Sequence, residues 1–261
     1  MREFMDKEYK NDELERLRLY RNSPLNEEAS GINDIQDKAV LSFNHDHEKD
    51  ETSVGKAIRK KVRILCWIMT HTNNTYKKAI NIAETWGKKC TKLIFISVDP
   101  KSNLTTVDLN VPDGRNFLWQ KTKKSFKYLY ENELNNYDWF LKGKKYTYCY
   151  LRYMLLGYSP KTPVFFGCRF KKYLTQGYNS GAGYILSREA LKRFVEIALK
   201  DPKKCKRHDN GAEDLEMGRC LQNVGVVAGD SRDSLGRHRM VPFDPLFHLR
   251  GDSHNVKSTK T

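Results

Sequence analysis

The sequence lacks several features that would assign it to common classes of protein. It has no Gly-x-Gly-x-x-Gly after a strand-like run and no Gly-x-x-x-x-Gly-Lys-Ser/Thr, which argues against dinucleotide-binding dehydrogenases and P-loop NTPases. Its longest apolar run, Ile64 to Met69, is far shorter than the roughly 20 residues of a membrane span. The first residues are charged and contain no apolar segment, so no signal peptide is visible.

The cysteines also lack a recognisable metal-binding spacing. None of the six belongs to a Cys-x-x-Cys pair, which argues against a zinc site. An even number of cysteines fits disulfides formed in a secretory lumen, and two Asn-x-Thr sequons add slight weight to that location. The cysteines are Cys66, Cys90, Cys149, Cys168, Cys205 and Cys220.

Positive charge is abundant but unevenly distributed. Residues 1–61 contain 12 Lys and Arg against 14 Asp and Glu, a balance of −2, whereas residues 62–261 contain 35 against 18, a balance of +17. A basic body suggests a phosphate-bearing partner, although a solvated lysine-rich surface explains the charge equally well. Because no RNA-binding signature or zinc-finger spacing is present, we expect no nucleic-acid partner.

The pattern of apolar residues predicts a single α/β domain after a tail. Residues 1–60 alternate charges with Asn and Ser and indicate a disordered or stem-like segment, in which Glu13 to Tyr20 could form a short helix. The domain is predicted over residues 61–250, followed by a flexible tail at 251–261. Buried strands are expected over the following segments: 62–69, 92–97, 139–141 and 164–167.

Helical periodicity appears between these strands. Helices are expected at 76–86, ended by Gly87, at 116–134, and after Ser187, a favourable N-cap. Alternation of strands with helices predicts a mostly parallel sheet flanked by helices. Ligands of such sheets bind beyond the carboxyl ends of the strands, which places the candidate site near Thr70 and near Gly143.

At this point a resemblance to a known family becomes specific. The order and spacing of several blocks resemble those of the core 1 β1,3-galactosyltransferases over about residues 60 to 250. The blocks are Val62 to Thr70, Glu84-Thr85-Trp86-Gly87 followed by Cys90, Trp119 to Thr122, Asp138 to Lys142, Gly183 to Ser187, Gly211 to Gly218, and Gly229 to Asp233.

The resemblance implies a fold, a reaction and a location. The fold implied is GT-A, a Rossmann-like α/β sandwich. The activity implied is inverting transfer of galactose from UDP-galactose to the 3-hydroxyl of GalNAc on Ser or Thr of glycoproteins. Family members are type II membrane enzymes of the secretory pathway, which implies the Golgi or another secretory lumen. The cofactor implied is Mn²⁺. Two oligomeric states are left open, a homodimer and a dimer with an active relative.

The resemblance also assigns roles to individual residues. Asp214 is the candidate base for the acceptor hydroxyl, because such a hydroxyl attacks poorly until its proton is removed. The alternative for Asp214 is an acid at a helix N-terminus with only a capping role, and for Glu213, the other member of the acidic pair, capping is the favoured interpretation. Thr85 and Trp86 are expected at the nucleotide pocket, although Trp86 also fits a helix core stripe. Lys121 either meets a phosphate or is solvated.

The cysteine pairs follow from the same comparison. Cys66 and Cys90 match the positions of a family disulfide, and a strand end and a helix–strand turn can approach closely enough to be bridged. Cys205 and Cys220 are expected as a second pair. Cys149 and Cys168 are left as packed or unpaired thiols.

The chain departs from the family where the metal would bind. The family has three consecutive Asp residues where this chain has Gly143-Lys144-Lys145-Tyr146. Lys144 and Lys145 would repel a divalent cation but could contact the diphosphate directly; alternatively the site is broken and both lysines point to water. Near the end of the chain, His248 is the one remaining candidate metal ligand, with a structural or solvated histidine as the favoured alternative.

Two functions are therefore kept open. The first is a working galactosyltransferase of reduced or altered activity, favoured by the retained Glu213-Asp214 pair. The second is a catalytically inactive relative that binds UDP or glycoprotein, or assists an active partner, favoured by the replaced Asp motif.

Overall fold

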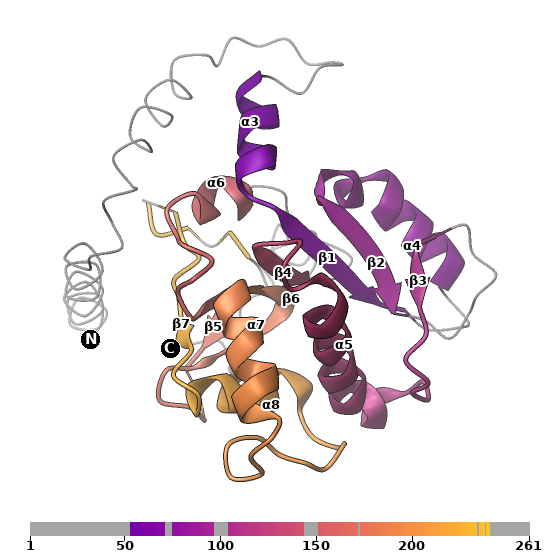
Figure 1. Cartoon of the computed structure of the whole chain (residues 1–261), viewed down its shortest axis with the longest axis vertical. Coiled ribbons are helices and arrows are strands. Elements are labelled where there is room, and N and C mark those ends of the chain that lie inside the picture. Colours follow the sequence, from indigo (N-terminus) through magenta and orange to yellow (C-terminus); the bar gives the residue numbers. More distant parts are fainter. Residues whose placement is uncertain are drawn as a thin grey trace, which may run out of the picture. The chain divides into compact units, whose positions relative to one another are not determined.

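The described part of the chain forms one α/β unit. The computed structural model describes residues 53–70, 75–96, 104–143, 151–171, 173–233, 235–237 and 239–240 of the chain. Nearly all of these residues lie in a compact unit that begins at Gly55 (Figure 1). The predicted tail up to residue 52 and the C-terminal tail lie outside the described residues, as does the short helix expected at Glu13 to Tyr20.

Seven strands of the described residues form one sheet in the order β3-β2-β1-β4-β6-β5-β7. All neighbouring strands are parallel except for the two pairs that contain β6, which runs antiparallel to β4 and to β5. The predicted mostly parallel α/β sheet of the GT-A type is therefore confirmed. The strands are β1 (Ile64–Met69), β2 (Lys92–Ile96), β3 (Thr106–Val107), β4 (Trp139–Lys142), β5 (Val164–Phe170), β6 (Tyr178–Ser187) and β7 (Val227–Ala228).

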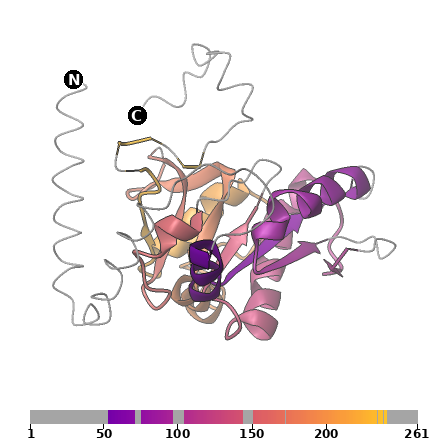
Figure 2. The same ribbon diagram turned by 90° about the horizontal axis from the view of Figure 1, so that it is seen from above.

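Helices cover the sheet and join its strands. Figure 1 shows α5, α7 and α8 together on one side of the sheet, and a view from above is given in Figure 2. The helices are α3 (Ser53–Lys61), α4 (Thr75–Glu84), α5 (Leu118–Glu133), α6 (Leu151–Leu155), α7 (Arg188–Arg193) and α8 (Glu213–Gln222). Shorter turns are η2 (Trp86–Lys89), η3 (Arg115–Phe117) and the π-helical η4 (Phe194–Ala198), which continues α7.

The expected elements are largely present, with two informative differences. The helix predicted to reach Trp86 ends at Glu84, and Trp86 instead begins the 3₁₀ turn η2. The long strand β6 was not predicted, because its glycines and polar residues interrupt the apolar pattern. Ser187 was expected as an N-cap, and its hydroxyl oxygen accepts the backbone N–H of Ala190.

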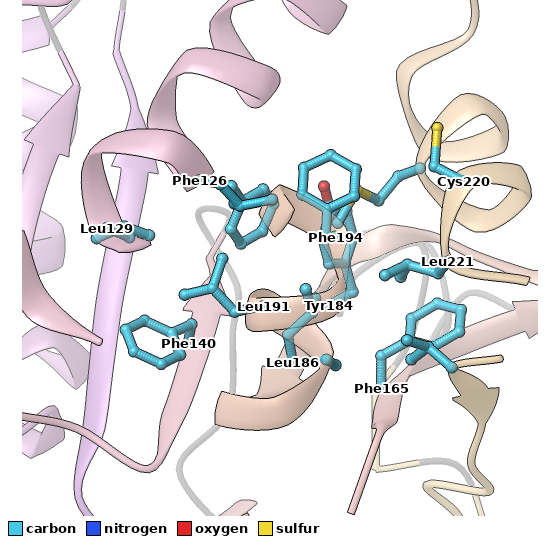
Figure 3. Packing of buried hydrophobic residues seen from close by; sticks show 14 of the residues in the cluster. Phe126, Leu129, Phe140, Phe165, Tyr184, Leu186, Leu191, Phe194, Cys220 and Leu221 are labelled. Atoms are coloured by element: carbon cyan, nitrogen blue, oxygen red, sulfur yellow. The ribbon is translucent and has the colours of Figure 1, made fainter. Parts of the chain in front are cut away.

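The main apolar core lies between the sheet and helices α5, α7 and α8. Successive side chains of a strand point to opposite faces, so Leu65 and Trp67 of β1 share this face. Trp67 meets Phe126 of α5 edge-on, with ring centroids 5.0 Å apart. Figure 3 shows how Phe126, Phe194 and Tyr184 gather there from a helix, the π-helical turn and a strand.

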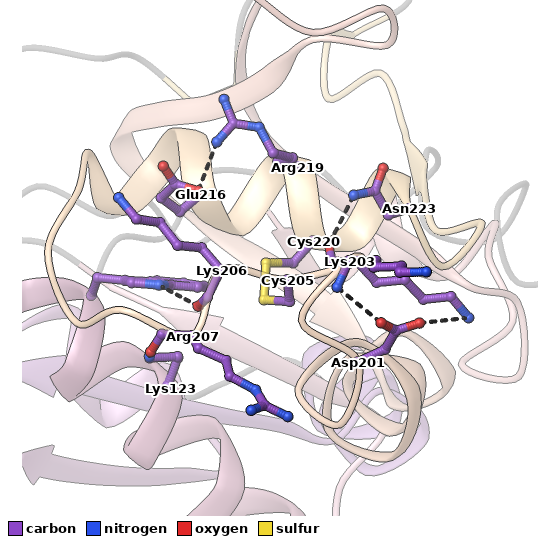
Figure 4. Close-up of a disulfide and its surroundings, with 12 residues drawn as sticks. Lys123, Asp201, Lys203, Cys205, Lys206, Arg207, Glu216, Arg219, Cys220 and Asn223 are labelled. Atoms are coloured by element: carbon purple, nitrogen blue, oxygen red, sulfur yellow. Dashed lines mark hydrogen bonds and ion pairs between the residues drawn. A yellow bond between two sulfur atoms is a disulfide. The ribbon is translucent and has the colours of Figure 1, made fainter.

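Two disulfides fix loops against this framework. Cys66 and Cys90 join β1 to the turn before β2, with their Cα atoms 6.0 Å apart. Cys205 and Cys220 join the loop that precedes α8 to that helix (Figure 4). The pair expected from the resemblance, Cys66–Cys90, and the second expected pair, Cys205–Cys220, are thus both present. Cys168 is a buried free thiol, and burial raises its pKa to about 11.

Candidate active site

The acidic pair lies where strand β4 ends. Lys142 is the last residue of β4, in register with Trp67 of β1 and Tyr184 of β6. Glu213 opens α8 and its carboxylate contacts the side chains of both Lys142 and Tyr184. The candidate site therefore sits at the carboxyl end of the parallel strand, where ligands of open α/β sheets bind.

Glu213 is held by three donors from three different elements. Its Oε2 accepts the Lys142 Nζ at 2.5 Å, and its Oε1 accepts the Tyr184 hydroxyl at 2.6 Å and the Thr122 hydroxyl at 2.9 Å. The side chains of Lys142 and Glu213 are only 7% and 8% exposed. A buried ion pair with additional hydrogen bonds costs much to break, because either charge would remain buried without a partner.

Aromatic rings surround the ammonium group of Lys142. Its Nζ lies 5.7 Å from the centre of the Trp67 ring and 5.3 Å from that of Tyr184. Such cation–π contacts are favourable for a cation withdrawn from water. The ammonium is therefore accommodated in this site as a charged group beside the Glu213 carboxylate.

The electrostatics of the pair follow from burial. Burial raises the pKa of Glu213, the Lys142 ammonium opposes this rise, and the neighbouring Asp214 carboxyl adds to it. Burial and the charge of Glu213 also hold the pKa of Tyr184 well above its ordinary value. Tyr184 is thus a neutral donor to Glu213 at physiological pH.

Asp214 is the more accessible member of the acidic pair. It is the second residue of α8 and half-buried, whereas Glu213 is buried. A carboxylate in the first turn of a helix is stabilised by the backbone N–H groups and the helix dipole. Asp214 is therefore the more exposed of the two carboxyls, whereas the Glu213 side chain is buried against Lys142, Tyr184 and Thr122.

The other site residues expected from the resemblance do not join this cluster. Lys121 is buried in an ion pair with Asp113, with its Nζ 2.7 Å from Oδ1, and is not a solvated lysine. Thr85 is exposed, and its hydroxyl donates to the carbonyl of Asn81. Trp86 packs on the face of the sheet opposite Glu213, against apolar clusters that include Cys66 and Ile68.

Trp86 nevertheless lies at the same end of β4. A Cβ atom added to Gly143 would come within 2.6 Å of the Trp86 ring, so the ring covers the backbone directly after β4. Core packing, one of the two roles expected for this ring, is therefore present. Lys144, Lys145 and His248 lie outside the described residues.

The residue types at the end of β4 do not fit a manganese ion. Hard divalent cations prefer oxygen ligands, and the positions of the family's Asp residues carry a glycine and lysines here. The described residues contain no group of three or more His, Cys, Asp or Glu side chains placed to hold a metal. Within the same residues, no helix is both long and apolar enough to cross a membrane.

Sequence reasoning missed the partners of Glu213. Lys142, Thr122 and Tyr184 each fall inside a block that carried the resemblance, but none was singled out as a site residue. One signal was available: Lys142 ends an apolar strand two residues after Phe140, and the period of two places both on the same buried face. A lysine ammonium on a buried face needs an anionic side chain nearby to neutralise its charge.

The loop after β7 is closed by its own ion pairs. The carboxylate of Asp230 accepts hydrogen bonds from the Arg232 guanidinium, with Oδ2 to Nε at 2.8 Å. Burial would raise the pKa of Asp230, but the bonds from Arg232 outweigh it and the pKa lies below its usual range. Asp138, in the block before β4, pairs with Arg63 and Arg188. These acids stabilise the fold around the site.

Comparison with known proteins places these features in a family. No family model matches the chain. The chain is similar to glycoprotein-N-acetylgalactosamine 3-beta-galactosyltransferase 1 of Xenopus laevis, with 40% identity over 240 residues. The match covers 90% of this chain and 66% of the relative, so the chain spans about two thirds of that protein's length. With the fold and the acidic pair described above, this similarity shows that the chain belongs to the core 1 β1,3-galactosyltransferase family.

Proposed function

We propose that the chain transfers galactose from UDP-galactose to GalNAc on Ser or Thr of glycoproteins. The observation that carries this proposal is the Glu213-Asp214 pair at the start of α8, beside the carboxyl end of β4. The similarity to the Xenopus galactosyltransferase supports the choice of reaction. The secretory lumen is the compartment we propose, because acceptors of this type are made there.

Asp214 is the proposed base. The acceptor 3-hydroxyl attacks the anomeric carbon of galactose from the side opposite the diphosphate, so that one carbon–oxygen bond forms as the bond to UDP breaks. The proton of the hydroxyl passes to the Asp214 carboxylate, and the electron pair of the broken bond leaves with UDP. Glu213 does not take part in this transfer, since its two oxygens already accept bonds from Lys142, Tyr184 and Thr122.

Substitution of the base tests this role. Asp214→Asn keeps the size of the side chain but removes its basicity, so we expect transfer to fall at least about a hundredfold. UDP affinity, measured by calorimetry, should stay almost unchanged because Asp214 need not touch the diphosphate. Asp201→Asn removes a half-exposed acid that lies 4.0 Å from Lys204 and serves as the control. A parallel loss of UDP binding in Asp214→Asn would place this residue at the nucleotide instead.

Lys144 and Lys145 are proposed to neutralise the diphosphate. They follow Gly143 directly, at the strand end where family members carry carboxylates. A pair of ammonium groups attracts the leaving group without a divalent cation. The proposal also keeps three residues near the nucleotide, where they would support the pocket and would not contact UDP directly: Thr85, Trp86 and Lys121. His248 stays a proposed metal ligand and lies outside the described residues.

Calorimetric titration of UDP tests whether the chain binds the nucleotide without a divalent cation. We expect binding to persist in chelator and to weaken in Lys144→Ala with Lys145→Ala. The matched control is Lys88→Ala with Lys89→Ala, because these two lysines are also adjacent in the sequence and are exposed in η2. Binding that disappears in chelator would refute metal-free binding. Absence of binding with and without manganese would favour the catalytically inactive relative, which the replaced carboxylates support.

A further inference from the structure

A strongly basic loop leads into α8 and the acidic pair. Residues 203–207 read Lys-Lys-Cys-Lys-Arg, so this short run contains four cations and no acid. Glu213 opens α8 shortly afterwards. Like charges placed so closely repel one another, and the run therefore does not stabilise the fold by itself. Such cations attract an anionic partner best when the fold holds them in a fixed place.

The backbone of this loop is anchored to the helices beside it. A disulfide ties Cys205 to Cys220 of α8. Three side chains also donate hydrogen bonds to loop carbonyls: Asn223 to Lys204 at 2.8 Å, Trp119 to Lys206 at 3.4 Å, and Lys123 to Arg207 at 2.7 Å. The cations therefore stand on a preorganised backbone, which loses little conformational entropy when a ligand binds. Because these bonds end on carbonyl groups, the side chains of Lys206 and Arg207 take no part in them.

Two of the loop cations are not neutralised. The acids beside them are already used in two ion pairs, Asp201 with Lys204 and Asp209 with Lys123. Among the residues that the structure describes, no carboxylate forms an ion pair with Lys206 or Arg207. Arg207 is exposed and Lys206 is partly exposed, and in Figure 4 both side chains extend away from the disulfide. These two residues, called here the basic rim, thus present two adjacent positive charges to solvent.

Helix α5 places the basic rim beside the acidic pair. Thr122 donates to Glu213 at 2.9 Å, and the next residue, Lys123, donates to the carbonyls of Arg207 and His208. Neighbouring residues of one helix therefore hold both Glu213 and the loop. An extended peptide advances about 3.3 Å per residue, so side chains two to four positions from a modified Ser or Thr reach about 7–13 Å. A peptide whose modified residue meets the acidic pair can thus bring its flanking residues to the rim.

We propose that Lys206 and Arg207 determine acceptor specificity, favouring glycopeptides with Asp or Glu close to the GalNAc-bearing Ser or Thr. This inference rests on the proposed function, because it needs the acceptor to meet the acidic pair. It concerns the peptide and not the sugar: the two cations attract peptide carboxylates and take no part in the transfer of galactose. The diphosphate of the donor is a second anion that the same cations would attract, so the assays must separate the two.

Transfer to three GalNAc-threonine peptides tests the basic rim. The peptides share one sequence except at the second and third positions on either side of the threonine, which carry Asp, Asn or Lys. With the wild type, kcat/KM should be about three- to tenfold higher for the Asp peptide than for the Asn peptide, since exposed charge pairs each contribute modestly. The Lys peptide should be the poorest acceptor. Raising the salt from about 50 mM to about 500 mM should remove most of the difference, because exposed charges are screened.

Variants of the rim show whether these two cations cause the preference. Lys206→Gln with Arg207→Gln should bring the Asp and Asn peptides to nearly equal kcat/KM. Lys60→Gln with Lys61→Gln is the matched control and should keep the preference, because it removes the same charge from the exposed end of α3, which leads into the amino end of β1.

Reversal of the charge gives a result that misfolding cannot produce. Lys206→Glu with Arg207→Glu should make the Lys peptide a better acceptor than the Asp peptide. Thermal unfolding shows whether each variant folds. If a double variant does not fold, Arg207→Gln alone should still lower the preference for Asp, since this side chain is exposed and only its carbonyl is anchored.

Peptide binding separates failure of this inference from failure of the proposed function. Calorimetry with UDP present measures the affinity for each peptide without turnover. If the chain transfers no galactose but binds the Asp peptide most tightly, and the Gln double variant loses this preference, the proposed reaction fails while the basic rim stands. Equal transfer to all three peptides at low salt would leave the reaction standing and overturn the inference. A Gln double variant that keeps the preference for Asp, or that loses affinity for UDP instead, would overturn it too, as would the absence of binding to any peptide.

Discussion

At the scale of single residues, the site depends on a close approach between two backbone segments. Gly183 of β6 has a φ of +88°, and a Cβ atom there would lie 2.2 Å from the carbonyl oxygen of Lys142. No side chain fits at this distance. The antiparallel strand β6 can therefore pair with β4 beside the acidic pair only because residue 183 is glycine.

Gly183→Ala should for this reason be strongly destabilising. The left-handed conformation alone costs an alanine about 1–2 kcal/mol, and the clash with Lys142 adds to it. Gly236→Ala is the matched control, because Gly236 has a φ of +76° but nothing within 4 Å of an added Cβ. Urea unfolding of both variants gives the comparison. Equal losses of unfolding free energy would show that the approach of β6 to Lys142 is not as close as described.

At the scale of elements, Ser187 links strand β6 to helix α7. Its hydroxyl donates to the carbonyl of Thr162 at 2.6 Å and accepts the backbone N–H groups of Ala190 and Val164 at 3.1 and 3.3 Å. The side chain is fully buried. Removing the hydroxyl would leave these three backbone groups, two of them buried, without this partner.

Ser187→Ala should lower the free energy of unfolding by about 2 kcal/mol, which combines a lost N-cap with an unsatisfied buried group. Ser125→Ala is the control, because Ser125 is equally buried but its hydroxyl only donates, to the carbonyl of Lys121 within the same helix. Denaturant unfolding should show little change for the control. A similar effect of the two substitutions would mean that the cap contributes nothing beyond an ordinary buried hydroxyl.

The disulfide beside α8 is the second structural support of the site. It closes a loop in which the carbonyl of Arg207 accepts a hydrogen bond from Lys123, and just before this loop the carbonyl of Lys204 accepts one from Asn223. Cys205→Ala with Cys220→Ala should reduce the free energy of unfolding by about 3 kcal/mol under non-reducing conditions. Reductant should destabilise the wild type more than this variant. No difference between the two proteins without reductant would contradict a bridge between these cysteines.

The sequence predicted elements better than it predicted contacts. Continuous apolar runs located β1, β2 and β4, since a strand buried on both faces has a simple pattern. The strand β6 was not predicted because the glycine and polar residues at 179–183 weaken the apolar signal, and Gly183 among them allows the close approach to Lys142 of β4. Similarly, Asp214 could be named from motif resemblance, whereas the sequence could indicate a buried lysine at Lys142 but not that its partner is Glu213, which lies in a distant segment.

At the scale of the whole molecule, acidic pH should weaken the fold through its paired carboxylates. Burial opposes ionisation of Asp230, but Arg232 holds its folded-state pKa below the usual value. A lowered pKa means that the paired carboxylate stabilises the fold above its unfolded pKa of about 4, and that this contribution is lost as pH falls through the folded value. The chain also becomes more positive than its formal +15 as carboxylates are protonated.

Asp230→Asn should accordingly reduce stability at pH 7 by about 1.5–3 kcal/mol, the usual contribution of hydrogen bonds to a charged group. Below the folded pKa of Asp230 the difference from the wild type should shrink. Thermal unfolding from neutral to acidic pH measures this, with Glu131→Gln as a control on the exposed face of α5. A loss that stayed constant at all pH values would show that the Asp230 charge is not what stabilises this loop.

The most direct test of the central claim is galactose transfer itself. The purified chain would be incubated with UDP-galactose and a GalNAc-threonine peptide, with manganese and separately with chelator, and the product measured by mass. We predict that the peptide becomes one hexose heavier and that UDP is released in the same reaction. The product should form in chelator as well as with manganese, and it should be absent with Asp214→Asn. Failure of the folded wild type to form product under both conditions would contradict the claim that this chain is a transferase.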